Sequence, residues 1–177
     1  FTEPLAAACE VVQQIHIKPT DRVVVIGDGK LGLLVAQVLA LTGCELHVIG
    51  RHPAKLSILE RRQIQVEQVP QGEESCLPHG WADVVVECTG NETGFATARR
   101  LVRARGKLVL KSTYAGALAV NLSLMVVDEI TLMGSRCGPF APALRLLAAG
   151  LIDVESLHTA TFSLNDSIAA MDYATQR

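Results

Sequence analysis

The sequence predicts an α/β protein with a doubly wound, six-stranded parallel sheet, and three observations lead to this fold class. Short apolar runs rich in β-branched residues alternate with helical patterns along the 177 residues. A glycine-rich turn joins the first of these runs to the helix that follows it. Hydrophobic residues make up 49% of the chain, which is enough for a sheet covered by helices on both faces. Right-handed crossovers between the strands would give the order 3-2-1-4-5-6.

The elements of the first half follow from the spacing of apolar residues and from turn signals. A helix is expected over residues 3–15, where Pro4 suits a first helical turn, and a strand over 22–26. The apolar run over 22–26 is short for a helix, and Gly27 follows it directly. The remaining elements of this half are a helix over 33–42 closed by Gly43, a strand over 45–49, a helix from His52-Pro53 through Leu59, and a strand over 63–69.

The second half follows a polar stretch, residues 70–80, that is expected to be a surface loop. Its predicted elements are a strand over 83–87, a helix capped by Asn91-Glu92-Thr93 that stops at Gly106, a strand over 107–110, an edge piece at 120–122, a strand over 130–133 and a helix over 142–149. We expect residues 1–150 to form one domain and residues 151–177 a short C-terminal extension, with an extended piece over 159–164 and a helix over 165–174.

The turn after the first strand reads Gly27-Asp28-Gly29-Lys30-Leu31-Gly32, a G-x-G-x-x-G pattern. The pattern alone is weak evidence, but between a strand and a helix, in a unit of about thirty residues, it is the dinucleotide-binding fingerprint of a Rossmann fold. Gly27 permits the tight turn, Gly29 lets the backbone approach a pyrophosphate, and Gly32 lets the helix pack close to the strand. The free N–H groups at the helix start would face the phosphates. The alternative is a glycine-rich turn that binds nothing.

Ligands of such sheets lie across the carboxyl ends of the strands, at the point where the strand order reverses. This rule selects the residues that follow five of the predicted strands. Gly90 and Gly134 would let the backbone approach the cofactor, or they are ordinary turn glycines. The expected cofactor-binding residues are Gly27, Gly29, Lys30, Leu31, Gly32, Gly50, Arg51, His52, Cys88, Thr89, Gly90, Lys111, Ser112, Thr113, Gly134 and Ser135.

The end of the second strand bears on the choice between NAD and NADP. An acid about twenty residues past the glycines binds the adenosine ribose of NAD, whereas a nearby Arg accommodates the 2′-phosphate of NADP. The residues here are Gly50-Arg51-His52, with no carboxylate among them, so we expect NADP, with NAD as the alternative. Arg51 could instead be a solvated charge or stack on the adenine.

Other reactive side chains form weaker sets. Lys111, Ser112 and Tyr114 resemble a hydroxyl–amine catalytic set, but neighbours at a strand end point to opposite faces, so backbone positioning is expected there. Asp128-Glu129 would face apart as neighbours before a strand. The five histidines form no H-x-x-x-H or Cys/His cluster, so no metal site is expected in these residues. Cys88 is expected to be a small core residue and not a nucleophile.

Composition narrows the class of protein further. The net charge is −2 and no block of Lys and Arg is present, which argues against binding to nucleic acid or to an anionic membrane. Five cysteines without a C-x-x-C pair indicate reduced thiols and a cytoplasmic location. No uncharged apolar run reaches the ~18 residues of a membrane span. The sequence starts in mid-pattern without Met, so we expect it to be a piece of a longer protein.

Six motifs follow one another along the chain: Glu3-Pro4-Leu5-Ala6, VVVIGDGKLG, HVIGRHPAKL, DVVVECTG, GKLVLKSTYAG and ITLMGS. By their order and spacing, and over essentially its whole length, the chain resembles the zinc-containing medium-chain alcohol dehydrogenases, nearest the threonine, polyol and glucose dehydrogenase branch. The resemblance implies a two-domain enzyme in which a barrel resembling GroES holds catalytic zinc, this domain holds the nicotinamide cofactor, and a small alcohol or polyol is the substrate. The zinc-ligating Cys and His-Glu pair of the family match positions upstream of Phe1, and its last strand would follow Arg177.

Further expectations come from the resemblance. Residues 151–177 resemble the segment that returns to the catalytic domain. Gly50 stands where NAD-using members carry Asp, so the cofactor choice is not simply inherited. In polyol-dehydrogenase-like relatives the Glu of the E-P-L motif lies near the catalytic zinc, which implies a catalytic or zinc-ligating role for Glu3; the alternative is that Glu3 only favours a helix N-terminus electrostatically.

The leading hypothesis is therefore the nucleotide-binding half of an NAD(P)-dependent, zinc-assisted alcohol dehydrogenase, which is inactive as this chain alone. A non-catalytic nucleotide-sensing Rossmann module is the alternative. A methyltransferase-like Rossmann domain is disfavoured by the third glycine of the fingerprint. Assembly into a homo-oligomer stays open.

Overall fold

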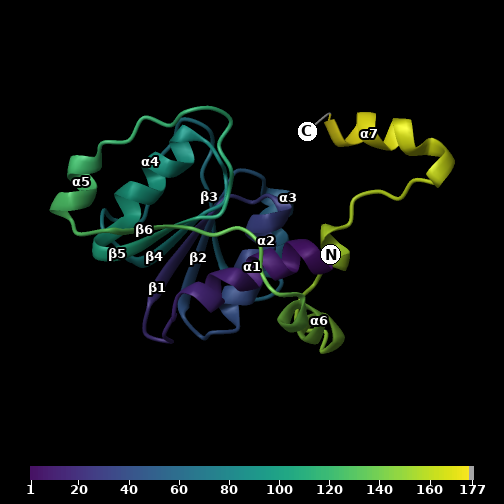
Figure 1. Ribbon diagram of the computed structural model, residues 1–177, viewed down its shortest axis with the longest axis horizontal. Helices are drawn as coiled ribbons and strands as arrows, with labels where there is room; N and C mark the ends of the chain where they lie inside the picture. The colour runs from purple at the N-terminus through teal and green to yellow at the C-terminus, as the bar shows by residue number, and fades with distance from the viewer. Residues whose placement is uncertain (176–177) are drawn as a thin grey trace.

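The computed structural model describes residues 1–175 and places six parallel strands in one sheet with helices on both faces (Figure 1). The strands run in the order β3-β2-β1-β4-β5-β6, which confirms the predicted doubly wound sheet. Each neighbouring pair is parallel. The strands are β1 (Arg22–Ile26), β2 (Glu45–Gly50), β3 (Gln65–Gln68), β4 (Ala82–Glu87), β5 (Val102–Leu110) and β6 (Thr131–Gly134).

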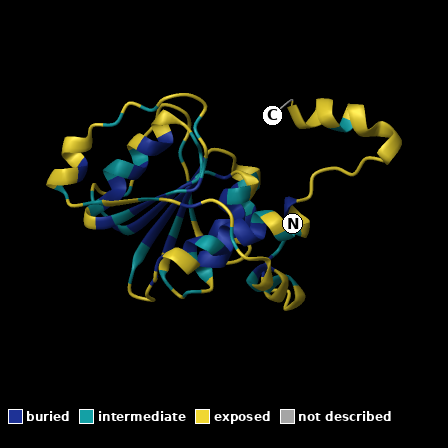
Figure 2. Ribbon diagram, viewed as in Figure 1, coloured by how far each residue is buried: buried dark blue, intermediate teal, exposed yellow. Residues whose placement is uncertain are grey.

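The hydrophobic core lies on both faces of the sheet because successive side chains of a strand point to opposite sides. In β1, Val23 and Val25 pack into one cluster, and Val24 and Ile26 pack into the other. The first cluster lies under α1 (Thr2–Gln14), α2 (Lys30–Ala40), α3 (Pro53–Glu60) and α6 (Phe140–Ala148), and the second lies under α4 (Glu92–Leu101) and α5 (Leu122–Val127). The buried residues accordingly concentrate in the sheet and in the helices beside it (Figure 2).

The predicted end of the helix that follows Asn91 is wrong. This helix, α4, ends at Leu101 and not at Gly106, and β5 begins directly at Val102. Val102 is buried in the core and pairs with Ala82, so sheet pairing overrides the helical pattern at this position.

A further prediction in the second half is wrong. Residues 120–122 do not form an edge piece, because the Asn121 side chain accepts a hydrogen bond from the Ser123 N–H (3.0 Å) and caps α5, a helix that the sequence did not indicate. The extended piece expected over 159–164 has no helix over 159–163, joins none of the six strands, and ends where η2 (Leu164–Asp166) begins.

The C-terminal segment leaves the sheet after α6. The 3-10 helix η1 (Glu155–Leu157) still places Leu157 in the core. Beyond it, η2 (Leu164–Asp166) and α7 (Ser167–Thr175) extend away from the rest of the chain (Figures 1 and 2), and their apolar side chains are exposed, Leu164 at 91% and Ile168 at 79%. The last two residues of the predicted 151–177 extension lie outside the described residues. None of the helices in residues 1–175 combines the length and apolarity of a membrane span.

Candidate functional site

A cavity of about 480 Å³ opens at the carboxyl ends of β1 to β4. The strand order reverses here, since β1 has β2 on one side and β4 on the other, and ligands of doubly wound sheets bind at this point. The wall comes from five segments, namely the glycine turn after β1, the end of β2, the loop after β3, the turn after β4 and the start of α4. A second cavity of similar volume, about 490 Å³, lies between α4 and residues 118–128 and contains none of the predicted site residues.

The cavity brings together part of the predicted cofactor-binding set. The predicted residues that line the cavity are Gly27, Gly29, Gly50, Arg51, His52, Cys88 and Thr89. The others lie outside its wall, either in the first turn of α2 or at and beyond the ends of β4, β5 and β6: Lys30, Leu31, Gly32, Gly90, Lys111, Ser112, Thr113, Gly134 and Ser135.

The three fingerprint glycines have the geometry that the pattern predicts. Gly27 has a φ of +113°, a conformation that L side chains rarely adopt. A Cβ on Gly32 would lie 2.0 Å from the Gly27 carbonyl oxygen, so only glycine allows α2 to start this close to β1. A Cβ on Gly29 would meet nothing within 4 Å, which leaves open space at the start of α2. No described side chain caps α2, and its first N–H groups are therefore available to an anion.

Asp28 is the site residue that the sequence analysis missed. Its Oδ2 accepts hydrogen bonds from the N–H groups of Arg51 (2.8 Å) and His52 (2.6 Å) and lies 3.0 Å from the His52 Nδ1. Burial acts to raise the pKa of Asp28, but the hydrogen bonds from His52 and Arg51 outweigh it and hold that pKa below its ordinary value. Residues 50–52 contain no carboxylate, as the sequence indicates. The folded chain nevertheless places the carboxylate of Asp28 at the end of β2, so the premise that none lies there is wrong.

Gly50 leaves the space that the Asp28 side chain occupies. A Cβ at this position would lie 2.7 Å from the Asp28 Cβ and 2.8 Å from the Leu56 Cδ2, both too close for real atoms. Glycine at the end of β2 thus makes room for the carboxylate that holds the next two residues.

Arg51 spans the cavity. Its Nη2 donates to the Thr93 Oγ1 (3.3 Å) in the first turn of α4, and its carbonyl oxygen accepts from the Gln68 Nε2 (3.2 Å) at the end of β3. The Arg51 guanidinium is therefore held beside the open space of the cavity and remains accessible to a ligand.

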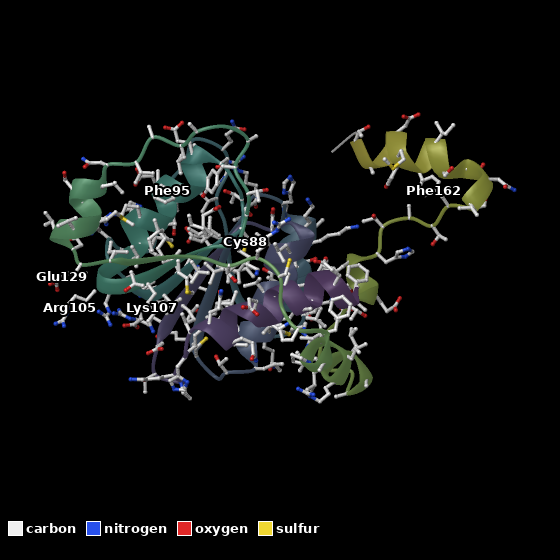
Figure 3. The ribbon with its side chains drawn as sticks, in the orientation of Figure 1. Cys88, Phe95, Arg105, Lys107, Glu129 and Phe162 are labelled. Atoms are coloured by element: carbon white, nitrogen blue, oxygen red, sulfur yellow. The ribbon has the colours of Figure 1, made fainter. Side chains whose placement is uncertain are left out.

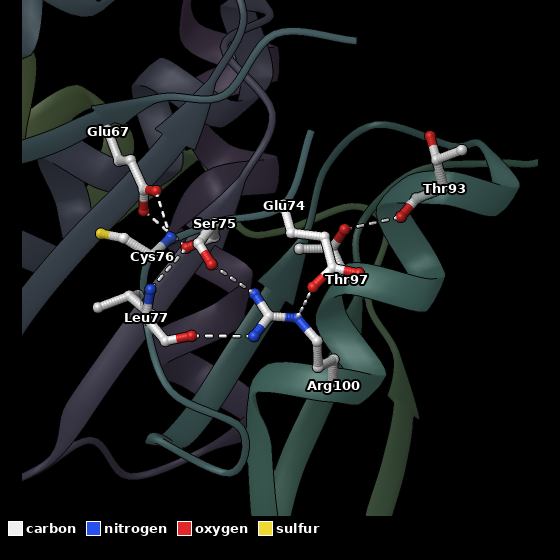
Figure 4. Close-up of polar contacts among 8 residues, drawn as sticks. All are labelled: Glu67, Glu74, Ser75, Cys76, Leu77, Thr93, Thr97 and Arg100. Carbon is white, nitrogen blue, oxygen red and sulfur yellow. Dashed lines mark hydrogen bonds and ion pairs between the residues drawn. The ribbon is translucent and has the colours of Figure 1, made fainter. Parts of the chain in front are cut away.

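The loop over residues 70–80 is fixed against α4 and supplies one wall of the cavity (Figure 4). The Glu67 carboxylate accepts from the Ser75 hydroxyl and the Cys76 N–H, both at 2.6 Å. Arg100 of α4 donates to the carbonyl oxygens of Leu77 (2.9 Å) and Ser75 (3.0 Å). The sequence predicts this stretch as a surface loop, and the charged contacts make it a defined wall.

The turn after β4 is organised by Glu87, a carboxylate with no exposed surface. Its Oε1 accepts from both the N–H and the hydroxyl of Thr89 (2.5 Å each), and its Oε2 accepts from the Tyr114 hydroxyl (2.6 Å). Burial and the Glu87 hydrogen bond raise the pKa of Tyr114. Gly94 is required beside this turn, because a Cβ there would lie 2.0 Å from the Thr89 Oγ1. Tyr114 thus has a structural partner and forms no pair with Lys111.

A family model described as zinc-binding dehydrogenase matches residues 31–149. The chain belongs to this family. The match runs from the start of α2 to the end of α6 and includes β2 to β6 of the parallel sheet.

Curated relatives and solved structures match this chain over about half of their own length. D-arabinitol dehydrogenase 1 of Uromyces fabae is 29% identical over 194 residues, which covers 100% of this chain and 55% of that protein. L-idonate 5-dehydrogenase from Escherichia coli superposes with a TM-score of 0.88 at 28% identity, over 99% of this chain and 52% of that one. A putative zinc-binding dehydrogenase from Sinorhizobium meliloti bound to NADP gives 0.76 at 25%, over 88% and 49%.

The zinc of this dehydrogenase family has no complete ligand set in residues 1–175, where no group of three or more His, Cys, Asp or Glu could hold a metal ion. Glu3 lies exposed in the first turn of α1, outside the cavity. A catalytic zinc would therefore need ligands from outside these residues.

Lys111 and Ser135 lie outside the cavity wall and contact each other. The Lys111 amine, which is buried, donates to the Ser135 Oγ (3.0 Å) and the Arg136 carbonyl oxygen (2.6 Å). Burial lowers the pKa of Lys111, and nearby groups that include Cys88 and Glu3 act in the opposite direction. These contacts join the end of β5 to the segment after β6.

The remaining sequence predictions agree with the geometry. Cys88 packs against the core and lies in the centre of the molecule in Figure 3, and burial together with the charge of Glu87 raises its pKa, so the thiol stays protonated. Asp128 pairs with Arg99, whereas Glu129 pairs with Arg105 (3.3 Å; Figure 3), so the two carboxylates serve different partners.

Proposed function

We propose that this chain is the nucleotide-binding half of an NAD(P)-dependent, zinc-assisted alcohol dehydrogenase that moves hydride between C4 of the nicotinamide and an alcohol carbon. The observation that carries the proposal is the cavity at the switch point, which combines an uncapped α2 N-terminus, open space at Gly29 and the Arg51 guanidinium. The family and the NADP carried by one structural relative support the same cofactor class.

The residues of this chain would bind and orient the cofactor, which supplies the hydride chemistry when bound. The first N–H groups of α2 would hold the pyrophosphate, since they have no cap and lie at the positive end of the helix dipole. The adenosine would occupy the cavity between β2, the loop after β3 and α4. The nicotinamide would extend toward the ends of β4, β5 and β6, where Thr89, Gly90, Lys111 and Ser135 lie.

We further propose a preference for NADP over NAD, because the Arg51 guanidinium would make a charge-assisted contact to the 2′-phosphate. Such a contact is worth about 1.5–3 kcal/mol, or roughly ten- to a hundredfold in affinity. Calorimetric titrations of the chain with NADPH and NADH test this. Arg51→Ala should remove most of the preference and leave NADH binding almost unchanged, whereas Arg61→Ala, an exposed arginine outside the cavity, should change neither. Equal affinities in the unmutated chain would contradict the proposal.

The catalytic half of the reaction would come from residues outside this chain. We propose that Glu3 lies near the catalytic zinc and that residues 151–177 return to the zinc-holding domain. Exposed side chains are available for both roles: Glu3 lies on the first turn of α1, and Leu164, Ile168 and Met171 present apolar side chains to solvent. A carboxylate is a competent zinc ligand, but one carboxylate alone cannot hold the ion. Five free cysteines fit a reducing compartment such as the cytoplasm.

A nucleotide-sensing module without catalysis is the alternative function. It is favoured by the internal partners of Lys111 and Tyr114, because these contacts separate the amine and the hydroxyl that the sequence offered as a catalytic set. The genomic reading frame upstream of Phe1 separates the two functions. A barrel-like segment with a Cys and a His-Glu pair would support the enzyme, and a stop codon immediately upstream would support the sensor.

A further inference from the structure

The geometry points to Asp28 as the positioning residue that sets the preference for the 2′-phosphate: it holds residues 50–52 so that the Arg51 guanidinium faces the adenosine end of the cavity. This inference rests on the proposed function and goes beyond it, because it assigns the specificity to a residue of the glycine fingerprint and not to the end of β2 alone.

The Asp28 carboxylate is already occupied by protein groups. It is 7% exposed, its Oδ2 accepts two backbone N–H groups, and the His52 ring lies within 3.1 Å of both oxygens. A ribose hydroxyl would have to displace one of these contacts. The partners also offset the charge of the carboxylate, which reduces its repulsion of a phosphate. Asp28 is therefore better placed to support the loop than to bind the ribose of NAD.

Asp28 also excludes the acid that usually selects NAD. That acid stands at the end of the second strand, which is the position of Gly50. Any side chain there would bring its Cβ to 2.7 Å from the Asp28 Cβ and to 2.9 Å from its carboxyl carbon. The sheet end can accommodate Asp28 or a side chain at position 50, but not both in the present conformation.

Arg51 is fixed at three points, and Asp28 supplies the first. Its N–H donates to Asp28 (2.8 Å), its carbonyl oxygen accepts from Gln68 (3.2 Å), and its guanidinium donates to Thr93 (3.3 Å) across the cavity. The loss of the first contact would free the backbone that carries the guanidinium. The entropy of ordering a long side chain would then count against every contact with a phosphate.

The test is the ratio of the dissociation constants for NADH and NADPH, measured by calorimetry on the 177-residue chain and on Asp28→Asn. The amide keeps the size of the carboxylate but offers one oxygen and two N–H donors to a site that needs acceptors. We expect the preference for NADPH to fall by about tenfold, mainly through weaker NADPH binding. Asp153→Asn is the matched control, since Asp153 also accepts a backbone N–H (Ser156, 3.0 Å) but lies outside the cavity, and its ratio should stay at the wild-type value.

Two further variants separate positioning from general damage. Adding Asp28→Asn to Arg51→Ala should lower the ratio no further, because Asp28 acts through Arg51. Gly50→Ala leaves the charge unchanged but displaces Asp28, so it should lower the ratio in the same direction.

The outcomes distinguish this inference from the proposed function. An unchanged ratio in Asp28→Asn overturns the inference alone, and so does a higher preference for NADPH, which would mean that Asp28 opposes the 2′-phosphate. A wild-type chain that binds neither nucleotide overturns the proposed function and, with it, the inference.

Discussion

Substituting Gly32 with Ala tests how α2 is held at the start of the cavity. The added Cβ would lie 2.0 Å from the Gly27 carbonyl oxygen, and real Cβ atoms essentially never approach closer than 3.0 Å. The first turn of α2 must therefore move away from β1 by at least the difference, 3.0 − 2.0 = 1.0 Å. The atom in the way belongs to the backbone, so no rotamer change relieves the contact.

The expected cost is set by two opposing effects. Ala is a better helix former than Gly by about 1 kcal/mol, but overpacking of this kind costs about 1–3 kcal/mol, and a 1 Å gap forfeits about a quarter to a half of the local dispersion energy. We expect a net loss of stability of about 1–2 kcal/mol, which lowers Tm by roughly 2–8 °C for a chain of this size. Because the shift moves the N–H groups of α2, NADPH affinity should fall as well.

Gly29→Ser is the control in the same turn. A side chain at Gly29 meets nothing within 4 Å, and Ser is a favourable N-cap residue, so Tm should stay within about 2 °C of wild type. The Ser side chain would nevertheless stand where the pyrophosphate is expected, and NADPH affinity should fall by more than about tenfold. Thermal melts and calorimetry measure both quantities. A Gly32→Ala chain with wild-type Tm and affinity, or a Gly29→Ser chain with wild-type affinity, would refute the reasoning.

Three other predictions concern groups around the cavity. Tyr114→Phe removes the hydroxyl donor to a carboxylate with no exposed surface and should destabilise the chain by about 1–3 kcal/mol in urea unfolding; a loss below about 0.5 kcal/mol would contradict the structural role. Lys111 has a pKa lowered by burial, so the unfolded chain binds more protons between that pKa and the ordinary value of 10.5, and stability rises with pH across this window. Lys111→Met should remove this contribution, and identical pH dependence of stability in both chains would exclude it. In a protein that joins this chain to the catalytic domain, Glu3→Gln should lower turnover or zinc retention with little change in cofactor affinity, and wild-type turnover and zinc content would contradict that role.

The sheet could be predicted because its central strands are short apolar runs that end in glycine turns. β1 and β4 are buried on both faces, and such strands leave a continuous hydrophobic signal in the sequence. The end of α4 and the start of β5 could not be predicted in the same way. Val102 fits the apolar pattern of the helix as well as that of the strand, and its pairing with Ala82 decides between them.

The cavity could be predicted only in part. The fingerprint is a local sequence pattern, whereas Asp28 contacts residues that are far from it in the sequence. The glycine spacing located the turn, yet the contacts of Asp28 with Arg51 and His52 join residues 23 and 24 positions apart. The wall over residues 70–80 depends on Arg100, which lies outside that loop, on α4. A charged residue between the first two glycines was the available signal for Asp28.

The central claim is that the nicotinamide dinucleotide binds at the carboxyl ends of β1 to β4, and backbone amide NMR of the chain titrated with NADP⁺ tests it most directly. The account predicts that the largest shifts fall on the amides of Lys30 and Leu31, in the uncapped first turn of α2, and on Arg51 and Thr93 at the cavity wall. Residues 118–128, which line the second cavity of about 490 Å³, should not respond. Shifts confined to residues 118–128, with none in the glycine turn, would contradict the account.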